Sequence, residues 1–350
     1  MSMTRILTEN ISLMGTEGTD RTMKKAAKLM VSAGILAASA AGTAYAVTKL
    51  LVDTALNREA PKIMRCLKKV IAGSKSVSQE LLDARQSASD KLLNTPMETV
   101  TILADDGTSL IGRWYPAEHP QRVIIAMHGW RSVWCKDFGM IADFWHNSGC
   151  SILFPDQRGQ NDSGGSYMGF GLLERHDCMA WIKWADARCD GALPIYLAGI
   201  SMGATTVLMT AGDSFPKSVR GIIADCGFTS PDCIWRYVVK KNLHLPYGIR
   251  RSVANYLCKR KICQEPHSYS TIDALKKATV PVLFIHGSDD HFVPVEMTYQ
   301  NFSACVSPKY LLIVPGASHG MSYIVNRKAY EEAVMNFFTA YDGITALETA

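Results

Sequence analysis

The sequence lacks both the cysteine spacing of a zinc site and the strong positive charge of a nucleic-acid-binding protein. Its 350 residues include ten cysteines, spread from Cys66 to Cys305, but no Cys-x-x-Cys pair, so we expect no metal site. The formal net charge of +5 is small for this length, and no nucleic-acid-binding signature is present, so we expect no nucleic-acid partner. A chain this long does not need disulfides to stabilise its core, which predicts reduced thiols and favours a cytosolic catalytic domain.

Charged residues are also absent between positions 29 and 48. This is about the length that a helix needs to cross a bilayer, and we therefore predict a membrane anchor over residues 29–48. Two alternatives remain open. Ala44-Tyr45-Ala46 is typical of a signal-peptidase site and would fit a cleaved export signal, whereas the many Ala, Gly and Ser residues would fit a helix that packs on protein. Lysines and arginines flank both ends, so neither membrane orientation is favoured.

The composition of the chain changes along its length and predicts four parts. A short basic segment occupies residues 1–28, and the predicted anchor follows at residues 29–48. A helical and basic linker covers residues 49–96, ending near the turn-forming Asn94-Thr95-Pro96. The remaining 97–345 is predicted to be one folded catalytic domain.

Within this domain, short apolar runs bounded by turns alternate with helical patterns. Continuous apolar runs suit strands that are covered on both faces, and the alternation predicts an α/β fold with a mostly parallel central sheet and helices on both faces. Residues 229–279 contain no strand pattern, and we predict a helical cap there, with a purely structural insertion as the alternative. The predicted strands are 98–103, 109–115, 123–127, 151–154, 195–200, 219–224, 282–285 and 311–314.

The most informative motif is Gly199-Ile200-Ser201-Met202-Gly203. It lies between a predicted strand and a helical pattern at residues 204–211, and Gly-x-Ser-x-Gly in this context is typical of a nucleophile elbow. A serine hydroxyl attacks well only when it projects from a sharp turn toward a base, and small residues on either side let the helix pack back on the strand. The motif therefore indicates Ser201 as a nucleophile.

Five sequence blocks occur at the ends of predicted strands. Because of these blocks, the chain from about Glu98 to Tyr341 resembles the α/β-hydrolase superfamily. Within the superfamily it resembles the serine-aminopeptidase-like and monoacylglycerol-lipase-like branch. The resemblance implies an α/β-hydrolase fold and a Ser-Asp-His triad. The blocks are His128-Gly129-Trp130, Asp156-Gln157-Arg158-Gly159, Gly199-Ile200-Ser201-Met202-Gly203, His286-Gly287-Ser288-Asp289-Asp290-His291-Phe292-Val293-Pro294 and Gly316-Ala317-Ser318-His319-Gly320.

The resemblance implies a role for each member of the triad. Ser201 needs a general base within hydrogen-bond reach, and His319 is the candidate because its loop follows the last strand. Asp290 is the expected acid, which would fix the histidine tautomer. Asp225, after the preceding strand, is the alternative acid because some hydrolases of this fold supply the carboxylate from that position.

The resemblance also implies an oxyanion hole built from two backbone amides, those of Trp130 and Met202. The chain departs from the family's pattern after Asp156-Gln157-Arg158-Gly159, where the family continues with His-Gly and this chain has Gln160-Asn161. We call the loop after the predicted strand 123–127, which contains Trp130, the oxyanion loop. Because of this departure, the resemblance does not predict the conformation or the substrate contacts of the rim beside that loop.

These features predict a serine hydrolase, carboxylesterase- or lipase-like or else peptidase-like, that acts through an acyl-enzyme and needs no cofactor. A small-molecule or lipid-like acyl group is the expected substrate, and the substrate-binding residues are unassigned. A thioesterase stays open. The alternative from another class is a non-catalytic, membrane-tethered α/β-hydrolase-fold protein with a binding or regulatory role.

Overall fold

The computed structural model describes residues 41–59 and 79–343. The chain divides into two units, residues 1–50 and residues 51–350. In the first unit the described residues, 41–50, are helical, and the hydroxyl of Thr48 donates a hydrogen bond to the carbonyl of Ala44. The second unit contains the whole predicted catalytic domain.

The predicted single-pass anchor over residues 29–48 is wrong. Residues 29–40 lie outside the described residues, and no helix in the described part of the chain is both long enough and apolar enough to cross a membrane. The physical reason is in the composition, because the segment is free of charge but rich in Ala, Gly, Ser and Thr, which bury little apolar surface. The membrane association that depended on this segment is not supported either.

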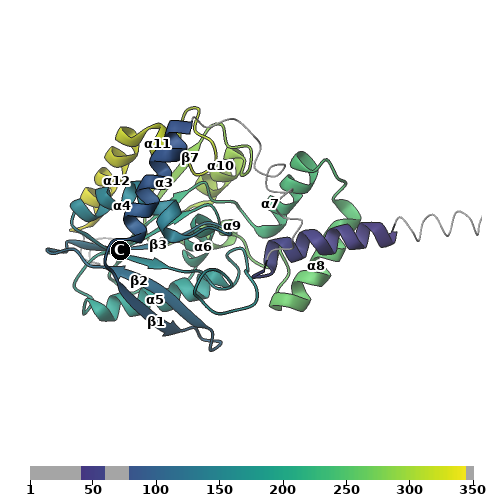
Figure 1. Cartoon of the computed structure of the whole chain (residues 1–350), viewed down its shortest axis with the longest axis horizontal. Helices are drawn as coiled ribbons and strands as arrows, with labels where there is room; N and C mark the ends of the chain where they lie inside the picture. The colour runs from purple at the N-terminus through teal and green to yellow at the C-terminus, as the bar shows by residue number, and fades with distance from the viewer. Residues whose placement is uncertain (1–40, 60–78, 344–350) are drawn as a thin grey trace, which may run out of the picture. The chain divides into compact units, whose positions relative to one another are not determined.

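The second unit is built on an eight-stranded sheet (Figure 1), with the strand order β1-β2-β4-β3-β5-β6-β7-β8. The first two strands form an antiparallel hairpin, β2 pairs antiparallel with β4, and all other neighbours pair in parallel. The strands are β1 (Glu98–Leu103), β2 (Ser109–Tyr115), β3 (Arg122–Met127), β4 (Cys150–Pro155), β5 (Ile195–Ile200), β6 (Val219–Asp225), β7 (Val282–Gly287) and β8 (Lys309–Val314).

Helices cover both faces of this sheet, which explains why β3, β4 and β7 are mostly apolar and are buried along their whole length. One face packs against α4 and α12 around Trp145 and Phe338, and the other packs against α5 and α6 around Trp181 and Val207. The helices outside the cap are α3 (Gln79–Leu93), α4 (Trp134–Asn147), α5 (Glu174–Arg188), α6 (Met202–Thr210), α10 (Val295–Ala304), α11 (Ser322–Val325) and α12 (Arg327–Tyr341).

The interval predicted to be a cap contains helices and no strand. These helices are α7 (Pro231–Tyr237), the π-helix η1 (Val238–Asn242), α8 (Gly248–Ile262) and α9 (Thr271–Leu275). Figure 1 shows α7 and α8 away from the sheet, and in the chain they follow β6. The predicted fold class, a mostly parallel sheet with helices on both faces and a helical insertion, is confirmed.

Candidate active site

The predicted nucleophile sits in a sharp turn between β5 and α6. Ser201 has φ 57° and ψ −118°, a backbone conformation that side-chain-bearing residues rarely adopt. The flanking glycines make this turn possible: a Cβ atom on Gly199 would lie 2.4 Å from the carbonyl of Gly203, and one on Gly203 would lie 1.8 Å from the carbonyl oxygen of Met127. Only glycine fits at either position, because such contacts are far below van der Waals distance.

The structure brings the three predicted triad side chains into one hydrogen-bonded chain. His319 Nε2 lies 2.9 Å from Ser201 Oγ, and His319 Nδ1 lies 2.6 Å from Asp290 Oδ2. The other oxygen of Asp290 accepts hydrogen bonds from the backbone amides of Phe292 and Val293, both at 2.9 Å. Ser201 follows β5, Asp290 follows β7 and His319 follows β8. Because these strands are parallel, their carboxyl ends lie at the same edge of the sheet.

The charges in this chain suit proton transfer. Burial alone would raise the pKa of Asp290, but the neighbouring His319 and His286 hold it well below its usual value, so the carboxylate stays ionised. Burial alone would lower the pKa of His319, but the charge and hydrogen bond of Asp290 more than offset this and raise the pKa above the ordinary 6.5. The imidazole therefore becomes a stronger base.

The alternative acid, Asp225, is close by but has a different partner. It is the last residue of β6 and is buried, and its Oδ1 accepts a hydrogen bond of 3.0 Å from the hydroxyl of Ser322. Burial raises the pKa of Asp225 to about 6. The structure thus pairs the histidine with Asp290 and gives Asp225 a separate hydrogen bond.

The two predicted oxyanion donors lie on either side of the nucleophile. Met202 is the first residue of α6, and Trp130 is in the loop that follows β3. Among the described residues, neither the backbone amide of Trp130 nor that of Met202 has a hydrogen-bond partner. An unpartnered amide beside the serine is what a developing oxyanion requires.

Gln160 and Asn161, at the departure from the family's pattern, both hold the loop after β3. The side-chain oxygen of Gln160 accepts a hydrogen bond of 2.6 Å from the backbone amide of Arg131, and the side-chain amide of Asn161 donates one of 2.9 Å to the carbonyl of Ser132. These contacts were not predicted, because a side chain that binds a backbone group leaves no motif in the sequence.

An aromatic cluster joins the cap to the body near the nucleophile. The ring of Phe170 lies 5.9 Å from those of Trp130 and Phe228 and 5.5 Å from that of Trp235 on α7. Met202 is buried in the same cluster. This cluster indicates an apolar surface between the cap and the oxyanion loop.

One further group of side chains has the donor atoms of a metal site. The Sγ of Cys226, a carboxylate oxygen of Asp290 and a ring nitrogen of His319 lie within 4.8 Å of one another. Burial keeps the pKa of the Cys226 thiol well above its usual value, which disfavours the thiolate that binds metals. Because the imidazole and the carboxylate are already paired with each other, an ion could bind here only by breaking the triad.

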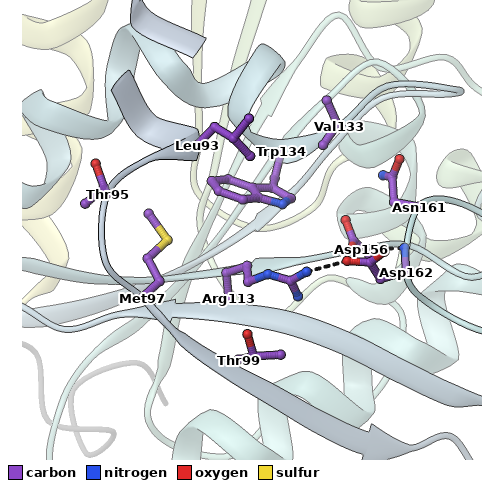
Figure 2. A pocket seen from close by; sticks show the side chains of 10 residues that line it. All are labelled: Leu93, Thr95, Met97, Thr99, Arg113, Val133, Trp134, Asp156, Asn161 and Asp162. Carbon is purple, nitrogen blue, oxygen red and sulfur yellow. Dashed lines mark hydrogen bonds and ion pairs between the residues drawn. The ribbon is translucent and has the colours of Figure 1, made fainter. Parts of the chain in front are cut away.

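A pocket of about 470 Å³ is lined by Val133 and Trp134 at the start of α4 and by residues of β1 and β2 (Figure 2). None of the predicted triad residues lines it. In it, Arg113 forms an ion pair with Asp162, whose backbone amide donates to the buried Asp156, and burial raises the pKa of Asp156. The lining residues are Leu93, Thr95, Met97, Thr99, Arg113, Val133, Trp134, Asp156, Asn161 and Asp162.

Comparison with known proteins agrees with this fold. The model of the prolyl oligopeptidase family matches residues 136–344, more than half of the chain. The uncharacterized protein YqkD of Bacillus subtilis is 30% identical over 189 residues, which cover 54% of this chain and 62% of that protein. The alignment thus spans less than two thirds of this relative.

Solved structures are similar at lower sequence identity. The Pyrococcus furiosus esterase Pf2001 superposes with a TM-score of 0.58 at 22% identity, covering 72% of this chain and 94% of the esterase. The acylaminoacyl peptidase of Pyrococcus horikoshii gives a TM-score of 0.55 at 18% identity, covering 73% of this chain and 44% of the peptidase. At these identities the structural likeness establishes the fold.

The sheet topology, the strained serine turn and these similarities define the chain as a serine hydrolase of the α/β-hydrolase superfamily. Because the family model matches most of its folded domain, the chain belongs to the prolyl oligopeptidase family.

Proposed function

We propose that this chain hydrolyses carboxylic esters through an acyl-enzyme on Ser201, with His319 as general base and Asp290 as the residue that orients it. The observation that carries the proposal is the continuous hydrogen-bonded chain from Ser201 Oγ through the imidazole to Asp290, with contacts of 2.9 and 2.6 Å. Its geometry is that of a nucleophile, a base and an orienting group.

The chemistry follows from the placement of the atoms. Asp290 accepts a hydrogen bond from the Nδ1–H of His319, which leaves Nε2 unprotonated and free to take the proton of Ser201 as its oxygen attacks the ester carbon. The carbonyl π electrons move to the oxygen, and the backbone amides of Trp130 and Met202 stabilise that oxyanion. When the tetrahedral adduct collapses, the alcohol leaves with the proton from His319. Water then repeats the sequence and releases the acid.

An apolar acyl group is the substrate that the surroundings favour. Trp130 and Trp235 are partly exposed and pack on Phe170, which is buried together with Phe228, so the two indole rings supply the accessible apolar surface. The esterase from Pyrococcus furiosus has the same fold. We therefore place esters of small, apolar acids ahead of peptides as substrates.

A probe reaction and a variant test this proposal. A fluorophosphonate should label Ser201 of the purified chain, and the chain should hydrolyse p-nitrophenyl esters. Ser201→Ala should stop labelling and lower kcat by about 10⁴-fold or more while circular dichroism stays unchanged. Hydrolysis at the wild-type rate by folded Ser201→Ala would show that another group performs the chemistry, and an unlabelled, inactive wild type would favour a binding protein. Aminoacyl p-nitroanilides, run in parallel, test for peptidase activity.

A further inference from the structure

The residues just before the catalytic domain dock against the loop that contains Trp130. We call residues 51–59 the N-terminal segment; they belong to the same unit as the sheet, and residues 51–56 are helical. The last carbonyls of a helix have no partner within it. Here three of them accept from the rim of the site: Thr54 from the Arg131 guanidinium at 2.8 Å, Ala55 from the Trp130 indole at 3.0 Å, and Leu56 from the Met168 amide at 2.7 Å.

Arg131 makes most of these contacts. Besides Thr54, its guanidinium donates to the carbonyl of Asn57 and, at 3.0 Å, to that of Arg58. A cation that donates to carbonyls at the C-terminal end of a helix is favourably placed in the field of the helix dipole. The planar guanidinium presents five donors in a fixed fork that can reach several carbonyls along one segment, whereas an ammonium group has three donors around a single nitrogen.

The same residue fixes the backbone next to the oxyanion donor. Arg131 has φ 50°, a conformation that is strained for a residue with a side chain. Its amide donates to Gln160 Oε1 at 2.6 Å, and the following carbonyl, of Ser132, accepts from Asn161 at 2.9 Å. Such strain persists only where the surroundings hold it, and here the N-terminal segment and the two rim residues do so from different directions.

The apolar side of the N-terminal segment joins the buried cluster that contains Met202. Val52 and Leu56 are 3% and 0% exposed and belong to the buried cluster that contains Met202 and Phe170. On the outer side, Lys261 of α8 donates to the side-chain oxygen of Asn57 at 2.8 Å. The segment therefore contacts the loop that contains Trp130 and the cap, and shares a buried cluster with Met202.

We propose that the N-terminal segment is a positioning element of the oxyanion hole and that Arg131 is the positioning residue through which it acts. The proposal rests on the proposed function, since it assigns to the Trp130 amide the role of an oxyanion donor. An oxyanion hole depends on donors held in place before the reaction starts. The contacts with residues 54–58 hold Arg131 in its strained conformation and so restrain the peptide between Trp130 and Arg131, which directly follows the residue whose N–H is the proposed donor.

The test uses Arg131→Gln and Arg131→Lys in the full chain. The kinetics of p-nitrophenyl acetate hydrolysis are measured per active site, with sites counted by fluorophosphonate labelling carried to completion. We expect kcat to fall about ten- to a hundredfold for Arg131→Gln with KM changed by less than about threefold, because a misplaced donor acts on the transition state. Arg131→Lys should recover only part of this loss. The affinity for a trifluoromethyl ketone, whose adduct carries the oxyanion, should fall in proportion to kcat/KM.

Arg175→Gln is the matched control. Arg175 is also a half-buried arginine, paired with Asp213 and stacked on Tyr269, but it has no contact with the oxyanion loop. It should lower thermal stability without changing kcat or the affinity for the ketone. If Arg131→Gln does not fold, Trp130→Phe, which keeps an aromatic ring but removes the donor to Ala55, should still lower kcat and ketone affinity together.

Two outcomes separate this inference from the proposed function. If the wild type is active and Arg131→Gln, or the fallback Trp130→Phe, retains wild-type kcat and ketone affinity, the positioning role is wrong while the triad assignment stands. If the wild type neither hydrolyses esters nor labels at Ser201, the proposed function itself fails.

Discussion

His319 pairs with Asp290 and not with Asp225, although both carboxylates are buried near Ser201, the proposed nucleophile. The Nδ1 atom of the histidine lies 2.6 Å from Asp290 Oδ2, whereas Asp225 accepts from Ser322. Two backbone amides also bind the second oxygen of Asp290, so that this carboxylate is fixed in orientation as well as charge. The two acids are therefore predicted to contribute very differently to catalysis.

Asp290→Asn should lower kcat for a p-nitrophenyl ester by about 10³- to 10⁴-fold. The side-chain oxygen would stay with the amides of Phe292 and Val293, so the NH2 group would face Nδ1 and donate to it, which favours the wrong histidine tautomer. Asp225→Asn keeps the shape and a hydrogen-bond acceptor for Ser322, so its effect on kcat should stay below about tenfold. Steady-state kinetics of both variants, with circular dichroism as a check of folding, make the comparison. Equal losses would mean that the acid has been misassigned.

The pH dependence of kcat/KM should report the ionisation of His319. The base must be neutral to accept a proton, and its pKa is raised above 6.5 by Asp290. Activity should therefore fall as the pH decreases, with the midpoint of the acidic limb above pH 6.5. In Asp290→Asn the charge that raises the pKa is gone, so the residual activity should have its midpoint at lower pH. An unchanged midpoint in that variant would contradict the conclusion that the charge of Asp290 raises the pKa of His319.

Gly203→Ala should be severely destabilising. The added methyl group would lie 1.8 Å from the carbonyl oxygen of Met127, the last residue of β3, whose backbone is paired in the sheet and cannot move away. We expect a loss of at least about 3 kcal/mol in the free energy of unfolding, measured in urea. Gly316→Ala is the control: that glycine has φ +72° but open space around it, so its cost should be only about 1 kcal/mol from backbone strain. Similar costs would argue against the close approach at the elbow.

The ion pair under the rim should also matter for stability. The Arg158 guanidinium donates to both oxygens of Asp177, at 2.6 and 2.5 Å, and both side chains are buried. Arg158→Met would leave a buried carboxylate unpaired, and we expect a cost of about 3–5 kcal/mol in urea unfolding. Lys328→Ala, which removes an exposed pair with Glu332, should change stability by less than about 0.5 kcal/mol. A cost below about 1 kcal/mol for Arg158→Met would show that the buried pair of Arg158 and Asp177 matters little for stability.

Much of the architecture followed from the sequence because the signals were local. Apolar runs located the strands from β3 to β8, and a hairpin pattern located β1 and β2, all to within a few residues. Gly199 and Gly203 indicated the turn around Ser201, where a larger residue would collide with the backbone. His319 was indicated by its place after the last strand. The choice between Asp290 and Asp225 needed the structure, because both follow neighbouring strands at the same edge of the sheet.

Other features could not be predicted because their signals are not local. Arg131 recognises backbone carbonyls of residues 54–58, which every sequence possesses, and the partner lies more than seventy positions away. The prediction of a membrane anchor over residues 29–48 was wrong for a different reason, because it rested on the length of the segment and its lack of charge. Small residues such as Ala and Gly are uncharged but are not apolar enough to hold a helix in a bilayer.

The central position of β3 has a practical consequence for anyone shortening the gene. The family match begins at residue 136, yet β3 pairs with both β4 and β5 in the middle of the sheet, and it leads directly into Trp130. A truncated product that starts at the match would lose three strands and expose unpaired edges on those that remain. Such a fragment should aggregate during expression, so the smallest useful clone begins upstream of Leu51.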